Sequence, residues 1–170
     1  MSISTSPAVR THRRRPTSVW ALVVVLMFLG ASAAGGGVAM LAGFTPPDRW
    51  LDRIPLVGNW VVPGLVLAVG FGAGSLITAY GVLRRPAWFW PATMDRITGH
   101  HWSWSAALLL GCGQVVWILL ELIFLPEGSA LQVVYGVAGA ALVLLSLLPP
   151  VRRDLAAATR QARQRARVRR

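Results

Sequence analysis

A few polar residues interrupt otherwise apolar stretches of this sequence, and these residues are the ones best able to do chemistry. Glu121 follows Trp117 by four positions and Gln114 by seven, so the three share one face of a helix. Gln132 and Tyr135 follow a short loop and are expected at a similar depth beside Glu121. A carboxylate in this position could titrate or bind a cation, and the alternative is an interfacial carboxylate that its neighbours satisfy. Gln114 either forms a hydrogen bond between helices or lines a polar path.

Four long apolar runs must position these residues. Each run is about as long as the roughly 20 apolar residues that a helix needs to cross the hydrocarbon core of a bilayer. Because that core offers no water to the backbone, each run is expected to be a helix. The sequence therefore predicts an all-α integral membrane four-helix bundle over residues 19–148, with spans at about 19–41, 60–83, 104–125 and 130–148.

Short basic segments flank the spans, and their charge predicts the topology. Residues 1–18 form a basic N-terminal segment, and residues 149–170 form an Arg-rich tail. All 17 basic residues are arginine, and all except Arg49 and Arg53 lie in these two segments and in the loop between the second and third spans. The loops at the other ends of the spans carry little net charge. By the positive-inside rule, both termini are expected on the cytoplasmic side of the plasma membrane.

The first apolar run also has features of a secretory signal peptide. Ala31-Ser32-Ala33 has the form of a cleavage site after an apolar stretch. The apolar sequence nevertheless continues through 35–37 to Leu41, as a spanning helix would. We therefore expect an uncleaved helix, and cleavage would leave three spans in the same orientation.

The basic tail is expected to meet anionic lipid headgroups. Nucleic-acid binding is conceivable on charge alone, but a segment tethered beside an anionic leaflet favours lipid. A solvated tail that only fixes the topology is the simpler alternative. The residues expected at the lipid surface are Arg152, Arg153, Arg160, Arg163, Arg167 and Arg170.

Small residues predict where the helices touch. Gly70 and Gly74 form a G-x-x-x-G pair in the second span, and Gly35 and Gly136 lie in small-residue segments of the first and fourth spans. Such residues let helix backbones approach closely in lipid. A glycine-rich nucleotide loop is excluded, because these glycines lie within spans and no strand precedes them.

Cysteine and histidine usage argues against redox and metal chemistry. Cys112 is the single cysteine, so the chain has no intrachain disulfide and no C-x-x-C pair, which excludes four-span thiol oxidoreductases. Cys112 is interpreted as a small core residue. Adjacent His100 and His101 point in different directions on a helix and make a poor chelate. No metal or cofactor is expected.

Two stretches of sequence carry a family resemblance. The first is 54–74 with the run Val62-Pro63-Gly64-Leu65-Val66-Leu67-Ala68, and the second is Trp117-Ile118 and Glu121 followed by Leu131-Gln132-Val133-Val134-Tyr135-Gly136. Over roughly residues 40–150 the chain resembles a family of small, uncharacterised four-span membrane proteins common in GC-rich Gram-positive bacteria. The resemblance implies the same four-span architecture and brings no activity or ligand. A looser similarity to DoxX-like four-span proteins adds no matching redox residues.

Together these features favour a small multi-pass membrane protein that is a non-enzymatic accessory or scaffold subunit. Its expected partners are the lipid bilayer and either another membrane protein or a second copy of the chain. The main alternative is a small oligomeric transporter or channel that uses the face of Glu121 and Gln114. A membrane enzyme or lipid-processing factor with Glu121 as acid or base ranks third.

Overall fold

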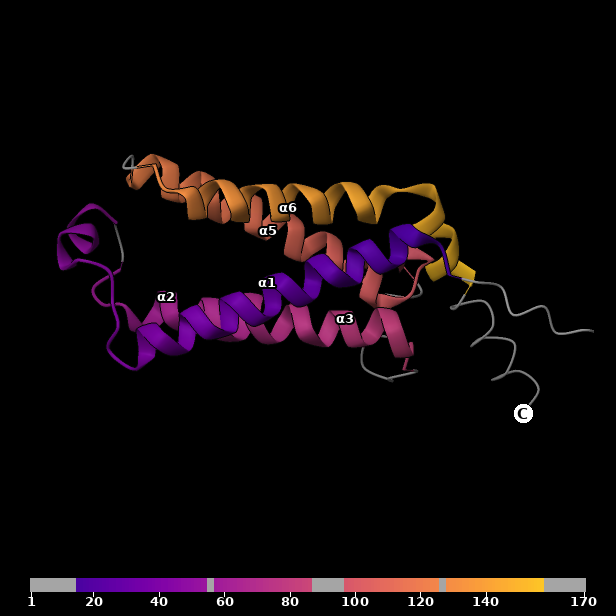
Figure 1. The fold of residues 1–170 in the computed structure, drawn as a ribbon, viewed down its shortest axis with the longest axis horizontal. Coiled ribbons are helices and arrows are strands. Elements are labelled where there is room, and N and C mark those ends of the chain that lie inside the picture. The colour runs from indigo at the N-terminus through magenta and orange to yellow at the C-terminus, as the bar shows by residue number, and fades with distance from the viewer. Residues whose placement is uncertain (1–14, 55–56, 87–96, 126–127, 158–170) are drawn as a thin grey trace, which may run out of the picture.

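The computed structural model describes residues 15–54, 57–86, 97–125 and 128–157, and the described elements are all helical (Figure 1). The first span is α1 (Thr17–Leu41), and a short 3-10 helix, η1 (Asp48–Arg53), follows it. The second span is built from α2 (Val61–Leu65), η2 (Val66–Ala73) and α3 (Gly74–Arg84). The third and fourth are α5 (Trp102–Phe124) and α6 (Ala130–Leu147), and a further helical stretch covers 149–157.

Four of these helical segments are long and apolar enough to cross a membrane. They run over Thr17–Leu41, Val61–Arg84, Trp102–Phe124 and Ala130–Leu147. The predicted all-α four-helix bundle is confirmed, and each predicted span differs from the observed helix by only a few residues at its ends. The chain is accordingly a multi-pass membrane protein.

The four spans pack as two pairs. α1 lies along the second span, and α5 lies along α6 with only a short connection between them. The two pairs meet where α1 contacts α6 and where α3 contacts α5. Figure 1 shows the pairs converging at one end of the bundle and separating toward the other. We call the first the basic end, because it carries Arg15, Arg84 and Arg85, and the other, which carries η1, the opposite end.

The buried core lies toward the basic end. Its α1 members come from the first half of that helix, and its α3 members come from the last part of the second span. Residues from the stretch after α6 complete it, so the chain beyond the fourth span belongs to the bundle. The buried core residues are Val19, Leu22, Val23, Leu26, Leu29, Ala79, Val82, Ala107, Leu142, Val151 and Leu155.

The second span is not a regular α-helix, and this changes which glycines make contact. From Val66 to Ala73 it is a π-helix, whose i→i+5 hydrogen bonds shift residues four apart onto different faces. Gly72 therefore meets α1: a Cβ on Gly72 would lie 2.8 Å from the Ala34 Cα. Gly37 is still closer, because a Cβ there would lie 2.4 Å from the Ala68 nitrogen.

The predicted packing glycines need correction. Gly35 has no neighbouring atom within 4 Å of where its Cβ would be, and Gly70 has only its own helix nearby. Neither contacts another of the described helices, because the π-helix turns Gly70 away and Gly37, two residues on from Gly35, takes the contact. Gly74 and Gly136 do meet other helices, at ordinary van der Waals distance, with contacts of 3.5 Å to Leu110 and 3.6 Å to Ile118.

Cys112 also differs from its sequence interpretation. Its side chain is exposed on α5 and is not part of the buried core. Its neighbour Gly111 provides the close contact with α6 instead, since a Cβ on Gly111 would lie 2.9 Å from the Leu142 Cβ.

Candidate functional site

Glu121 lies in the last turn of α5 and is hydrogen-bonded within its own helix. Trp117 Nε1 donates to Glu121 Oε1 at 2.6 Å. The four-residue spacing makes this contact possible, because residues i and i+4 of a helix lie on the same face. The carboxylate is half-buried. Trp117 and Glu121 therefore share one face of α5, as their spacing predicts, and the structure adds the hydrogen bond between them.

Gln132 reaches Glu121 from α6 while it also caps that helix. The Ser129 hydroxyl accepts a hydrogen bond from the Gln132 backbone N–H at 3.3 Å, and Gln132 Oε1 accepts one from the Ser129 N–H at 3.0 Å. This reciprocal pair is a capping box. The Gln132 side chain also interacts with Glu121. Because its amide oxygen is used in the cap, the amide nitrogen is the atom that can donate to the carboxylate. Gln132 is buried.

The Tyr135 and Trp117 rings connect the two helix pairs, and Trp117 does so while it also hydrogen-bonds Glu121. The Tyr135 ring stacks on Phe28 of α1 with centroids 6.2 Å apart. The Trp117 ring packs edge-on against Phe71 of η2 with centroids 6.0 Å apart. These two aromatic contacts join the pairs near the middle of the spans, and Glu121 lies one helical turn beyond Trp117 toward the opposite end.

Gln114 is separate from this group. It is buried, with only 4% of its surface exposed, and its side chain lies against Gly139 of α6. A Cβ on Gly139 would lie 3.0 Å from the Gln114 Cγ. Gln114 therefore packs inside the α5–α6 hairpin, and the structure does not bring it together with Glu121 and Gln132 in one site.

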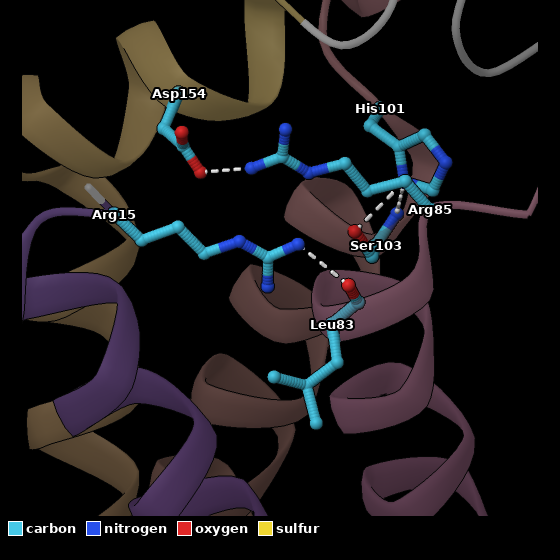
Figure 2. A network of polar contacts seen from close by, with 6 residues as sticks. All are labelled: Arg15, Leu83, Arg85, His101, Ser103 and Asp154. Carbon is cyan, nitrogen blue, oxygen red and sulfur yellow. Dashed lines mark hydrogen bonds and ion pairs between the residues drawn. The ribbon is translucent and has the colours of Figure 1, made fainter. Parts of the chain in front are cut away.

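A second polar cluster, which the sequence analysis did not identify, lies at the basic end (Figure 2). An ion pair joins Arg85, which directly follows α3, to Asp154 in the stretch after α6. Arg15 extends from the start of α1, and its Nη2 donates to the Leu83 carbonyl oxygen at 2.6 Å. The one feature of the sequence that could have indicated this cluster is Asp154, the one acidic residue in the strongly basic segment 149–170.

The electrostatics of this cluster are unbalanced. Burial and, to a smaller extent, the neighbouring charge of Arg85 lower the pKa of Arg15 below its usual range, while Asp154 partly offsets them. Two guanidinium groups thus share one carboxylate. Arg85 and Asp154 are partly buried, with 24% and 19% of their side chains exposed. We call Arg15, Arg85 and Asp154 the arginine cluster.

The two histidines of this region have structural partners. His101 Nδ1 lies 2.8 Å from the Ser103 hydroxyl at the start of α5, and its backbone N–H donates to the Leu155 carbonyl oxygen at 3.3 Å. His100 stacks on the Trp104 ring with centroids 4.6 Å apart. Within the described residues, no group of three or more His, Cys, Asp or Glu side chains could hold a metal ion.

The predicted lipid-facing tail begins as part of the bundle. Val151 and Leu155 are fully buried, whereas Arg152 and Arg153 on the same stretch are exposed. The contact of these two arginines with lipid headgroups stays a prediction. The remaining predicted lipid contacts, Arg160, Arg163, Arg167 and Arg170, lie outside the described residues.

Comparisons with protein-family models, curated proteins and solved structures find no match to this chain. The resemblance to the four-span family thus rests on the sequence stretches that suggested it.

Proposed function

We propose that this chain is a non-enzymatic accessory or scaffold subunit of a membrane assembly, with both termini on the cytoplasmic side of the plasma membrane. The distribution of charge supports the orientation. Among the described residues, the basic end carries Arg15, Arg84, Arg85, Arg152 and Arg153 against Asp154, whereas η1 at the opposite end offsets two arginines with two aspartates. This asymmetry is the one that the positive-inside rule describes.

The separation of the two helix pairs toward the opposite end is the observation that carries the accessory role. The pairs are held together at the basic end by the core and by aromatic contacts near mid-span. Beyond those contacts the pairs diverge (Figure 1). Phe124 lies seven positions after Trp117, so it continues the α5 face that points toward the other pair. A span from a partner protein or a second copy would cover this face.

Photo-crosslinking tests the accessory role. A photoreactive residue in place of Phe124 should give one discrete heavier product in native membranes. The same residue in place of Leu109, which is 62% exposed on α5 nearer the basic end, should give none. Mass spectrometry of the product identifies a partner or a second copy. A protein that gives no product at Phe124, and that purifies as a monomer in mild detergent, contradicts the proposal.

A transporter or channel is the second candidate, and the position of Glu121 favours it. The carboxylate is half-buried on the inner face of α5, in the half of the bundle where the pairs separate. The burial of Gln114 inside the hairpin weighs against a continuous path along both residues. A transporter predicts a pH-dependent flux in proteoliposomes that Glu121→Gln abolishes. An unchanged flux in that variant rules this candidate out.

A further inference from the structure

The arginine cluster contains two positively charged guanidinium groups and one negatively charged carboxylate, and all three are partly buried. Arg15 and Arg85 are close enough for the charge of one to act on the other, and among the described residues Asp154 is the one carboxylate that interacts with them. Figure 2 shows both guanidinium groups extending into the same space, Arg85 toward Asp154 and Arg15 toward Leu83. An added anion would complete the charge balance of this group.

Both arginines are fixed in place before any ligand arrives. Arg85 adopts a left-handed backbone conformation, with φ 50° and ψ 52°, which is unfavourable for a residue with a side chain. Its backbone N–H caps α3 by donating to the Gly81 carbonyl oxygen, and the ion pair with Asp154 fixes the direction of its side chain. Arg15 is anchored by its hydrogen bond to the Leu83 carbonyl oxygen. Side chains held in this way lose little conformational freedom on binding.

The guanidinium groups also retain hydrogen-bonding capacity. Each guanidinium carries five N–H donors in a planar fork. Arg85 Nε is buried and donates to no acceptor among the described residues. Guanidinium forks match the oxygen geometry of phosphate and bind it through paired, charge-assisted hydrogen bonds. The anion that best fits two adjacent forks is therefore a phosphate group.

The location of the cluster indicates the source of that phosphate. Arg15 lies two residues before α1, and Arg85 directly follows the segment Val61–Arg84 that can span a membrane. Both residues therefore lie at the boundary between hydrocarbon and headgroups, which is where a phospholipid places its phosphate. A lipid phosphate reaches this boundary at high local concentration.

We propose that Arg15 and Arg85 form a defined site for the phosphate of an anionic phospholipid at the basic end of the bundle. Asp154 positions Arg85 and, because it is negative, also limits the affinity of the site. The proposal does not depend on the accessory role. It differs from general attraction of a basic surface, which would treat exposed Arg84 and partly buried Arg85 alike.

Lipid titration of the purified full-length chain tests the site. The protein in mild detergent is titrated with phosphatidylglycerol or with phosphatidylcholine, and bound lipid is counted by native mass spectrometry. Near physiological ionic strength, exposed charges are screened beyond a Debye length of about 8 Å. Arg15→Gln and Arg85→Gln should each weaken phosphatidylglycerol binding at least about tenfold, because each removes charge-assisted hydrogen bonds. Phosphatidylcholine binding should change little.

Arg84→Gln is the matched control, since it removes the same charge one residue away from an exposed position. It should change phosphatidylglycerol binding by no more than about twofold. Asp154→Asn should strengthen that binding, because it removes the competing carboxylate. Equal losses from Arg84→Gln and Arg85→Gln would overturn the site in favour of diffuse surface charge.

Three further measurements complete the experiment. Circular dichroism checks that each variant is folded, and Arg15→Gln leaves the Arg85–Asp154 pair intact in case Arg85→Gln does not fold. Arg85→Lys keeps the charge but not the planar fork, so it should also weaken binding. Millimolar inorganic phosphate should not displace the lipid. Full displacement would overturn the assignment of a lipid and identify a soluble phosphate compound as the ligand.

Discussion

Arg85 and Asp154 form an ion pair although 69 positions separate them in the sequence. Arg85 directly follows the second span, and Asp154 belongs to the helical stretch that follows the fourth. The pair thus ties the two halves of the chain together at the basic end, beside the buried Val151 and Leu155. Both this ion pair and the buried apolar core therefore hold the helices together at this end.

Replacing Asp154 with Asn should destabilise the protein. The substitution leaves the partly buried Arg85 guanidinium without its carboxylate, and an unpaired buried polar group costs about 1–3 kcal/mol. Thermal unfolding in detergent measures the effect. Asp52→Asn, which removes an exposed carboxylate from η1, is the matched control and should have little effect. The exchanged pair Arg85→Asp with Asp154→Arg should recover part of the loss. If the two single Asn variants unfold at the same temperature, the ion pair contributes nothing.

The helical stretch after α6 should prove part of the fold and not an independent tail. Leu155→Ala removes a fully buried side chain, and such a cavity costs roughly 2–5 kcal/mol. Leu148→Ala removes the same atoms from a side chain that is 39% exposed, so its effect should be much smaller. Thermal unfolding of both variants gives the comparison. Similar unfolding temperatures would mean that the stretch does not pack as described.

Much of the fold follows directly from the sequence, because the length of an apolar run decides whether it can cross a bilayer. The spans that begin near Val19, Trp60, Trp104 and Ala130 could therefore be predicted without knowledge of any tertiary contact. The contact between Trp117 and Glu121 was also accessible, since it depends only on the spacing within one helix. The approach of Gln132 required only the short loop between α5 and α6.

Other features depend on contacts that a single sequence does not reveal. The contact of Gly72 in place of Gly70 follows from the π-helix in the second span, because the i, i+4 rule assumes a regular α-helix. On α1, the contact of Gly37 in place of Gly35 depends on which face of that helix meets the second span. The Arg85–Asp154 pair needs the stretch after the fourth span to come close to the end of the second span. Both features depend on tertiary contacts, which the length and composition of the spans leave open.

Replacing Gln132 with Glu should separate its two roles. Glu at this position preserves the capping box, so an isolated helix would tolerate it. Here the new carboxylate faces Glu121 in a half-buried setting, and two like charges in contact repel. We expect Gln132→Glu to lower the unfolding temperature at neutral pH and the additional substitution Glu121→Gln to restore it. The penalty requires both carboxylates to be ionised, so it should shrink as the pH is lowered. A variant that is equally stable with or without Glu121 would show that the two side chains do not interact.

Alanine substitutions at neighbouring glycines should distinguish close helix contacts from open positions. A Cβ at Gly37 would fall 2.4 Å from the Ala68 nitrogen, so Gly37→Ala must push α1 away from the second span. Overpacking of this kind costs about 1–3 kcal/mol. Gly35→Ala meets no atom within 4 Å and replaces a poor helix former with the best one, so it should be neutral or stabilising. Gly72→Ala and Gly70→Ala form a second pair with the same expected contrast. Unfolding temperatures of the four variants in one detergent provide the measurement. If Gly35→Ala and Gly70→Ala are the damaging changes, the helix register differs from the one described, and the original G-x-x-x-G prediction would be restored.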